Sequence, residues 1–155
     1  MLKFLYLKLN LRMVFIMTLT LKVRDVMENG VVILEENLSA KHALDAMLEH
    51  GVWSVVVSAK GLPVGVVTER DILRRVVAKG RNLAEVQLRE IMSCPLITID
   101  PDAPLGKAWE IMVEKDIRRL YVVEKGKIIG RVTHKGLFQK LLDALIALSS
   151  MKYLV

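Results

Sequence analysis

The sequence contains one cysteine, Cys94, and aromatic residues make up only 5% of its 155 positions. A single cysteine cannot form a disulfide within the chain or supply a cysteine-based zinc site. This usage fits a reducing compartment, and we expect a cytoplasmic protein. Because 53% of the residues are hydrophobic and few are aromatic, the core is expected to be aliphatic. A chain of this length can bury about two-thirds of its unfolded surface.

Long uninterrupted hydrophobic runs are also missing. Lys8 and Arg12 interrupt the apolar N-terminal extension, residues 1–21, so no 18-residue span suits a transmembrane helix. No small-residue cleavage site of a signal peptide follows, and we predict no membrane association. Two interpretations of the extension remain open. It is either an added strand or upstream translation of a gene that begins at Met13 or Met17.

Acidic residues are absent from residues 1–22, which hold four of the 23 basic residues. The formal net charge of +6 therefore arises mostly in this tail, since the remainder carries 19 basic and 17 acidic residues. A nucleic-acid-binding protein normally carries its basic stripe on the folded body. The charge distribution therefore disfavours nucleic acid as a partner.

Catalytic and metal-binding patterns are missing as well. The three histidines have no metal-ligand spacing with one another or with a carboxylate cluster. No nucleophile, base and orienting group can be assembled from the motifs of the chain. We predict that the protein is not an enzyme and uses no metal and no catalytic cofactor.

The sequence does contain an internal repeat, at an offset of 65 residues and without a gap. The matching segments are 23–27 with 88–92, 31–34 with 96–99, 55–57 with 120–122, and 65–68 with 130–133. Apolar positions of helical spacing between these segments also match in phase. Two copies cannot make a solenoid, so they predict a pair of units related by a pseudo-twofold axis.

Each copy has the pattern strand, helix, strand, strand, helix, which predicts an α/β (α+β) fold. Ser39 is a predicted N-cap and Gly51 a helix end. Short glycine-containing turns at 59–61 and 124–126 predict hairpins. The first copy spans residues 22–79 and the second spans 86–150, where the last helix is long and apolar. An apolar helix at a chain end usually packs on something, here either the N-terminal extension or a second subunit.

The two copies differ at the turn before their last helix. Thr68 is a predicted N-cap with Asp71 three residues later, an arrangement that caps a helix. A hydroxyl, a carboxylate and free backbone N–H groups at a strand-to-helix turn also suit phosphates and ribose hydroxyls. The second copy keeps Thr133 but has Gly136 in place of the acid. Capping therefore does not require Asp71, which favours a ligand role.

With these motifs in place, the chain resembles a tandem CBS-domain protein, or Bateman module, from about residue 22 to 144. The resemblance rests on Val23-Arg-Asp-Val-Met27, Leu88-Arg-Glu-Ile-Met92, Gly65-Val-Val-Thr-Glu-Arg-Asp71 and Ile117-Arg-Arg-Leu-Tyr-Val-Val123. It implies two βαββα units with their sheets packed face to face and two clefts between them. It also implies a regulatory adenine nucleotide ligand (AMP, ADP, ATP) or S-adenosylmethionine.

The resemblance also implies roles for individual residues. Ribose binding falls on Thr68 and Asp71, and the second site, with Gly136, is expected to be degenerate because glycine cannot hold the ribose diol. One tight site per chain is therefore expected. The complete assignment is ribose at Thr68 and Asp71; phosphate at Arg118, Arg119 and Lys135; adenine at Val32, Ile33 and Val66; and the degenerate second site at Thr98, Thr133 and Gly136.

Three functional hypotheses follow. The leading one is a non-catalytic sensor of adenine nucleotides, whose ligand shifts an equilibrium by its differential affinity for two states. The second is a ligand-independent assembly module, and the third is a nucleic-acid-associated module that uses the basic tail. We also expect a homodimer, because the apolar terminal helix needs cover.

Overall fold

A computed structural model of the chain describes residues 21–150. The two interpretations of the N-terminal extension concern residues that lie almost entirely outside this range. The chain divides into two compact units, and each combines segments from both sequence repeats. We call them the β1–β3 unit, residues 30–97, and the β4–β6 unit, of which residues 21–29 and 98–150 are described.

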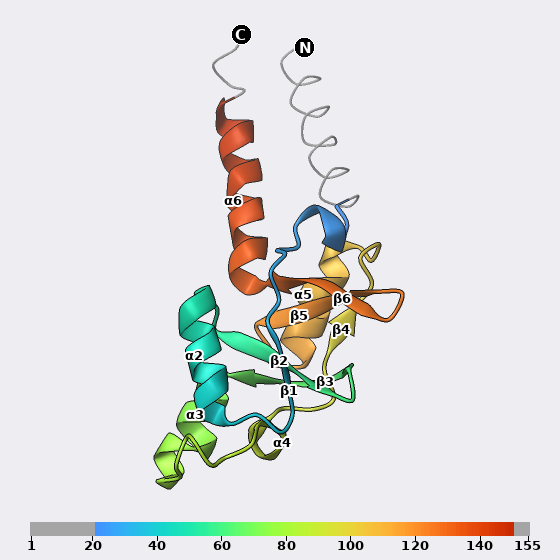
Figure 1. Cartoon of the computed structure of the whole chain (residues 1–155). Helices are drawn as coiled ribbons and strands as arrows, with labels where there is room; N and C mark the ends of the chain where they lie inside the picture. Colours follow the sequence, from blue (N-terminus) through green and yellow to red (C-terminus); the bar gives the residue numbers. More distant parts are fainter. Residues whose placement is uncertain (1–20, 151–155) are drawn as a thin grey trace, which may run out of the picture. The chain divides into compact units, whose positions relative to one another are not determined.

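The β1–β3 unit is a three-stranded sheet with helices from the first repeat and from the start of the second (Figure 1). Strand β1 is parallel to β2 because α2 crosses over between them, and β2 is antiparallel to β3. The elements are β1 (Ile33–Glu35), α2 (Ala40–His50), β2 (Ser54–Ala59), β3 (Leu62–Thr68), α3 (Glu69–Arg75), η2 (Val77–Lys79) and α4 (Leu88–Ile91).

The β4–β6 unit has the same topology. Strand β4 is parallel to β5, and β5 is antiparallel to β6. The elements are η1 (Val23–Asp25), β4 (Thr98–Ile99), α5 (Leu105–Glu114), β5 (Arg119–Glu124), β6 (Lys127–Thr133) and α6 (His134–Ser150). The predicted order of strands and helices is therefore confirmed in both copies.

Local signals in the sequence place the ends of these elements. Ser39 is the N-cap of α2, and Gly51 ends that helix in the left-handed conformation at φ 62°. The two hairpins turn through Lys60–Gly61 and Lys125–Gly126, where all four residues have positive φ. Such turns match the right-handed twist of the paired strands. These predictions are confirmed.

The core of each unit is aliphatic, as the composition predicts. In the β1–β3 unit, Val55, Val57 and Val67 point from one sheet face into a cluster with the helices. Burying one such side chain contributes about 1.5–3 kcal/mol. The β4–β6 core is formed by Val23, Val26, Ile99, Ala108, Met112, Leu120, Tyr121, Val122, Val132 and Leu137.

Each repeat opens with a lead segment, residues 21–29 in the first and 86–94 in the second, and each lead segment packs on the sheet of the other repeat. Glu28 and Arg131 exchange two backbone hydrogen bonds at 2.8 and 2.9 Å across the β4–β6 unit. Ser93 and Val66 exchange the corresponding pair at 2.8 and 3.0 Å in the β1–β3 unit. Each lead segment is therefore an additional short partner of the last strand of its unit.

Glycine is required where the lead segments cross these strands. A Cβ atom at Gly65 would lie 2.8 Å from the Ser93 carbonyl oxygen. A Cβ atom at Gly130 would lie 2.8 Å from the carbonyl oxygen of Glu28. Both distances are shorter than a van der Waals contact. The Gly residues that open the Gly-x-x-Thr motifs therefore serve the close approach of two backbones.

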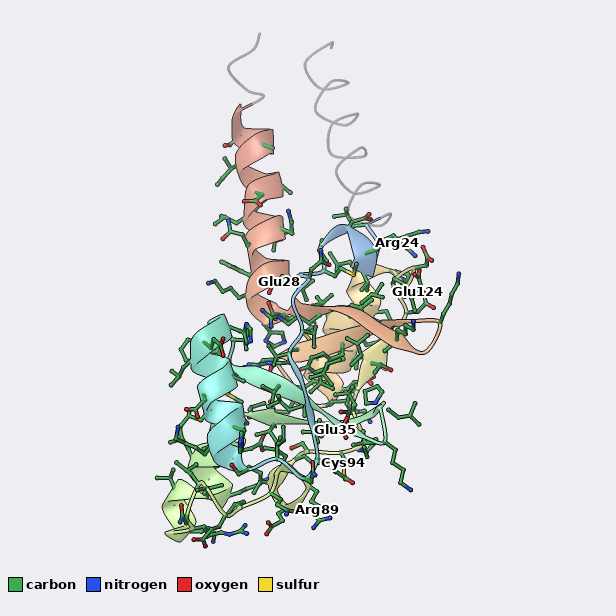
Figure 2. The ribbon with its side chains drawn as sticks, viewed as in Figure 1. Arg24, Glu28, Glu35, Arg89, Cys94 and Glu124 are labelled. Carbon is green, nitrogen blue, oxygen red and sulfur yellow. The ribbon has the colours of Figure 1, made fainter. Side chains whose placement is uncertain are left out.

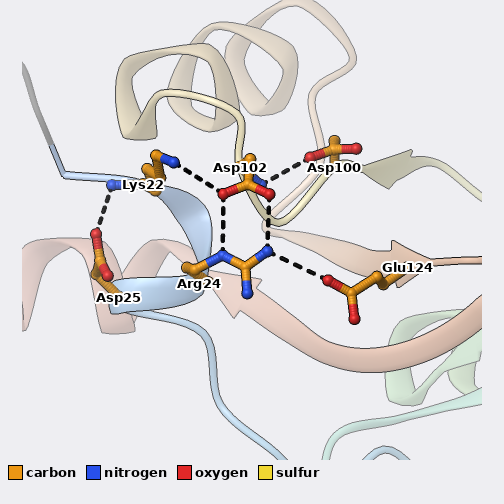
Figure 3. A network of polar contacts seen from close by, with 6 residues as sticks. All are labelled: Lys22, Arg24, Asp25, Asp100, Asp102 and Glu124. Atoms are coloured by element: carbon orange, nitrogen blue, oxygen red, sulfur yellow. Dashed lines mark hydrogen bonds and ion pairs between the residues drawn. The ribbon is translucent and has the colours of Figure 1, made fainter.

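An exposed polar network holds the first lead segment to its unit (Figure 3). Asp102 accepts hydrogen bonds from Arg24 at 2.8 and 3.1 Å and from Lys22 Nζ at 2.9 Å. Arg24 also contacts Glu124 at 3.2 Å. The hydrogen bonds from Arg24, and then the one from Lys22, lower the pKa of Asp102 to about 2.

Helix α6 carries an apolar face that is largely exposed. Leu137 is buried, whereas the apolar side chains that follow it are exposed: Phe138, Leu141, Leu142, Leu145 and Ile146. The predicted helix and its apolar stripe are confirmed. Within residues 21–150, no helix is both long and apolar enough to cross a membrane.

Candidate ligand site

The turn between β3 and α3 brings a hydroxyl and a carboxylate together. Thr68 is the N-cap of α3, and its Oγ1 accepts a hydrogen bond from the Asp71 amide at 3.2 Å. The Asp71 carboxylate in turn accepts from the Thr68 amide at 2.9 Å and from the Thr68 hydroxyl at 2.7 Å. The predicted cap is confirmed, and it includes the reciprocal bonds of a capping box.

Asp71 has further partners around its second carboxylate oxygen. Oδ1 lies 3.4 Å from both the Ser93 hydroxyl and the Arg75 guanidinium. Arg75 also donates to the carbonyl oxygens of Ile91 and Met92 at 2.6 and 3.0 Å. The acid is thus held in place by α3 and by the second lead segment. Asp71 is a buried acid, and 12% of its side chain is exposed.

Two apolar residues of the predicted site share one face of the same sheet. Ile33 pairs with Val56, which pairs with Val66, so the three side chains form one row. Thr68 is two residues beyond Val66 and therefore points to the same face. Ile33 is 47% exposed. The structure thus brings Ile33, Val66 and Thr68 to one face.

Val32 behaves differently from its neighbour. It precedes β1, its carbonyl oxygen accepts from the Val56 amide at 2.9 Å, and its side chain packs against the helix-side core. Alternation along an extended chain turns it away from the face that carries Ile33. The side chain of Val32 is therefore not grouped with the other predicted adenine contacts.

The remaining predicted residues belong to the β4–β6 unit. Arg119 opens β5 and pairs with Thr133, whereas Arg118 is exposed and its carbonyl oxygen accepts from the amide of His134 at 3.0 Å. Lys135 is exposed in the first turn of α6. The row that corresponds to Ile33, Val56 and Val66 consists of Thr98, Tyr121 and Arg131.

Gly136 is next to an acid that the motif did not predict. The Glu28 carboxylate from the first lead segment accepts from the Thr133 hydroxyl and from Arg131 Nε, each at 3.2 Å. Figure 2 shows Glu28 near the first turn of α6. Sequence reasoning missed this residue, although the repeat held a signal, since Glu28 matches Ser93 at the offset of 65.

The chain forms two βαββα units from one repeated sequence pattern, and this arrangement is typical of a class of paired α/β modules. The family model described as CBS domain matches residues 23–78 and 88–143, well over half of the chain. The chain therefore belongs to the CBS-domain family. Pairs of CBS domains are regulatory modules.

Relatives agree with this assignment. An uncharacterized protein of Methanopyrus kandleri is 47% identical over 95 residues, 60% of this chain and 48% of that protein. The CBS domain-containing protein YhcV of Bacillus subtilis is 32% identical over 110 residues, 71% of this chain and 78% of that one. The chain thus spans about half of the first relative and most of the second.

A solved structure supports the fold. The CBS domain pair of protein MJ0100 was crystallised in complex with 5′-methylthioadenosine and S-adenosyl-L-methionine. It superposes with a TM-score of 0.71 at 22% identity and covers 79% of this chain and 96% of that one. At this level of identity the likeness concerns the fold alone.

Proposed function

We propose that the protein is a non-catalytic regulatory module that binds an adenine nucleotide or S-adenosylmethionine in the β1–β3 unit. Thr68 and Asp71 hold the ribose hydroxyls, and Ile33 and Val66 contact the adenine ring. The observation that carries the proposal is the presence of this hydroxyl–carboxylate pair on the same sheet end as two partly exposed aliphatic side chains.

The chemistry of the ligand supports the same assignment. Both compounds bound by the MJ0100 pair contain an adenosine moiety, with an aromatic base and a vicinal diol. A diol donates two O–H groups, which an ionised carboxylate is suited to accept. Aliphatic side chains offer an apolar surface to the flat face of the base. Arg118, Arg119 and Lys135 keep their predicted phosphate role, and Val32 supports β1 from the core side.

A second candidate function is ligand-independent assembly. The exposed apolar face of α6 favours it, since large apolar patches on a protein surface mark interaction sites. We propose a homodimer in either case. The third hypothesis, association with nucleic acid, rests on a basic tail that lies almost wholly outside the described residues. It predicts salt-dependent retention on DNA or RNA that is lost when residues 1–22 are deleted.

The decisive experiment is isothermal titration of the full chain with AMP, ATP, S-adenosylmethionine and adenosine, repeated for Asp71→Ala. Loss of charge-assisted hydrogen bonds should cost roughly 1.5–3 kcal/mol, a drop in affinity of about tenfold to a hundredfold. The matched control is Asp45→Ala, because Asp45 is an exposed acid of the same unit and is paired with Lys41. It should leave the affinity unchanged.

Thermal unfolding of the same variants separates ligand binding from capping. Removing the acid of the capping box should cost about 1 kcal/mol of stability. If Asp71→Ala lowers the melting temperature and leaves every affinity intact, Asp71 only caps α3. The assembly module is then the better account of the protein.

A further inference from the structure

The two units place an acid at equivalent positions by different routes. In the β1–β3 unit the acid is Asp71 on the helix, and Ser93 of the lead segment lies beside it. In the β4–β6 unit the helix position is Gly136, and the lead-segment position is Glu28. The acid and the small residue have therefore exchanged places between the two copies.

The geometry of Glu28 follows that of Asp71. Glu28 Oε1 lies 3.2 Å from the hydroxyl of Thr133, as Asp71 Oδ2 lies 2.7 Å from the hydroxyl of Thr68. A Cβ atom at Gly136 would lie 3.1 Å from Oε1. A side chain at position 136 would therefore make the carboxylate shift by a few tenths of an ångström.

Glu28 is held from several directions. Its backbone is fixed by the two hydrogen bonds to Arg131, and its Oε2 accepts from Arg131 Nε. A carboxylate has about four acceptor positions, and these side-chain contacts use two of them. Glu28 is 43% exposed at the side chain, compared with 12% for Asp71. The carboxylate is thus held by two partners and remains open to a ligand.

We infer that Glu28 is the acid of a second ribose-binding site, in the β4–β6 unit, where Gly136 had predicted a degenerate one. The inference rests on the proposed function, since it assigns to Glu28 the role proposed for Asp71. The ligand class is a ribonucleoside with a free vicinal diol. The inference gives two sites per chain. The sequence motif predicted one tight site, because it considered an acid only at position 136.

The second site differs from the first in its contacts to the base. Thr98 and Arg131 stand where the β1–β3 unit has Ile33 and Val66. A hydroxyl and a guanidinium offer less apolar surface to an adenine ring than two aliphatic side chains do. The second site therefore selects the sugar more than the base.

The test is a titration of the full chain with adenosine, which has the diol and no phosphate. We expect two adenosines per chain for the wild type and one each for Glu28→Gln and Asp71→Ala. In Asp71→Ala, which retains the second site, 2′-deoxyadenosine should bind at least about tenfold more weakly than adenosine, because it lacks one diol hydroxyl. Glu124→Gln is the matched control, because Glu124 is equally exposed and also pairs with an arginine at 3.2 Å.

A second variant tests the same role of Glu28 without replacing this residue, so the test still holds if Glu28→Gln does not fold. Gly136→Ala keeps Glu28 but puts a methyl group 3.1 Å from its carboxylate oxygen. The shifted carboxylate should bind adenosine more weakly, while circular dichroism should show an intact helix, because alanine favours helix over glycine. Unchanged adenosine binding in both Glu28→Gln and Gly136→Ala overturns the inference.

The outcomes also separate this inference from the proposed function. A single adenosine site that Asp71→Ala abolishes and Glu28→Gln preserves leaves the proposed function standing and refutes the second site. A single site that Glu28→Gln abolishes and Asp71→Ala preserves supports the role of Glu28 and refutes the site in the β1–β3 unit. No adenosine binding by the wild type refutes the second site, and the proposed function is refuted as well if AMP, ATP and S-adenosylmethionine also do not bind.

Discussion

Asp71 and Glu28 show how one chemical group reaches equivalent places from different parts of the chain. Asp71 projects from a helix, and Glu28 projects from a lead segment that crosses the neighbouring strand. Each carboxylate accepts a hydrogen bond from a threonine hydroxyl. Glu28, which comes from the lead segment, has a longer side chain than Asp71, which comes from the helix. The chemistry of each site therefore depends on the position of the carboxylate group in space, and not on the position of its residue in the sequence.

Asp102 provides a pH-dependent prediction at the same scale. Its pKa is lowered to about 2 by Arg24 and Lys22, so its contribution to stability is fully present above the ordinary aspartate pKa of 3.8. That contribution is lost as the pH falls through about 2, because protonation then removes the charge. Asp102→Asn should lower the urea midpoint at pH 7, and the difference from the wild type should shrink between about pH 4 and about pH 2.

Asp45→Asn is a suitable control for Asp102→Asn. Asp45 is an exposed acid paired with Lys41 within a single helix, and it connects no separate segments. Isolated surface pairs of this kind contribute little to stability. The interpretation of Asp102 is contradicted if its variant differs from the wild type by the same amount at pH 2 and at pH 7.

Among the elements, the lead segments decide how the repeats are completed. Each passes so close to the last strand of its unit that the strand has glycine at the crossing, Gly65 in one unit and Gly130 in the other. A Cβ atom at these two glycines would also lie 2.9 and 3.1 Å from the sulfur atoms of Met92 and Met27, respectively. The Gly-x-x-Thr motif therefore combines a packing requirement at its first residue with a polar site at its last.

Gly65→Ala tests this packing requirement. The added methyl group would lie 2.8 Å from a backbone carbonyl oxygen that cannot move without shifting the lead segment. Overpacking of this kind costs about 1–3 kcal/mol, measurable by urea denaturation. Gly106→Ala in α5 is the control, because a Cβ there meets nothing within 4 Å. Equal stability of the two variants would show that the crossing tolerates a side chain.

The exchange of acids between the units gives a second prediction for the elements. Asp71→Gly should weaken adenosine binding in the β1–β3 unit by about tenfold to a hundredfold. Adding Ser93→Glu recreates the arrangement of Glu28 and Gly136, and we expect it to restore most of the lost affinity. Isothermal titration measures both steps. A double variant no better than Asp71→Gly would mean that an acid on the lead segment cannot replace one on the helix.

The whole molecule contains two units of one topology, and α6 extends from the second with its apolar face exposed. A helix of 17 residues is about 25 Å long. Its exposed apolar face is therefore much larger than the surface of a single scattered apolar side chain. Such surfaces on soluble proteins usually mark an interaction. A second copy of the chain provides an identical face and hence a symmetric contact.

We therefore predict a homodimer that depends on α6. Light scattering at micromolar concentration should give twice the chain mass, both for the full chain and for a form that begins at Met17. Leu141→Glu should reduce the mass to that of a monomer, because it places a charge on the apolar face. Lys140→Glu, on an adjacent exposed position of the helix, should leave the dimer intact. A monomeric wild type in both forms rules out the prediction.

The sequence by itself determined the repeat, the order of strands and helices, the aliphatic core and the caps at Ser39 and Thr68. These features depend on side-chain periodicity and on hydrogen bonds between residues close in the chain. They can therefore be read without knowledge of distant contacts. The same local logic identified the hydroxyl–carboxylate pair of the candidate site.

Only the tertiary structure decided which sheet each lead segment joins and which acid lies beside Gly136. Glu28 and Thr133 are 105 residues apart in sequence and meet through their side chains at 3.2 Å. The structure also separated Val32 from Ile33, because one packs in the core and the other lies on the opposite sheet face. Contacts of this kind arise when whole elements pack together, and no local pattern encodes which distant side chain will fill a given space.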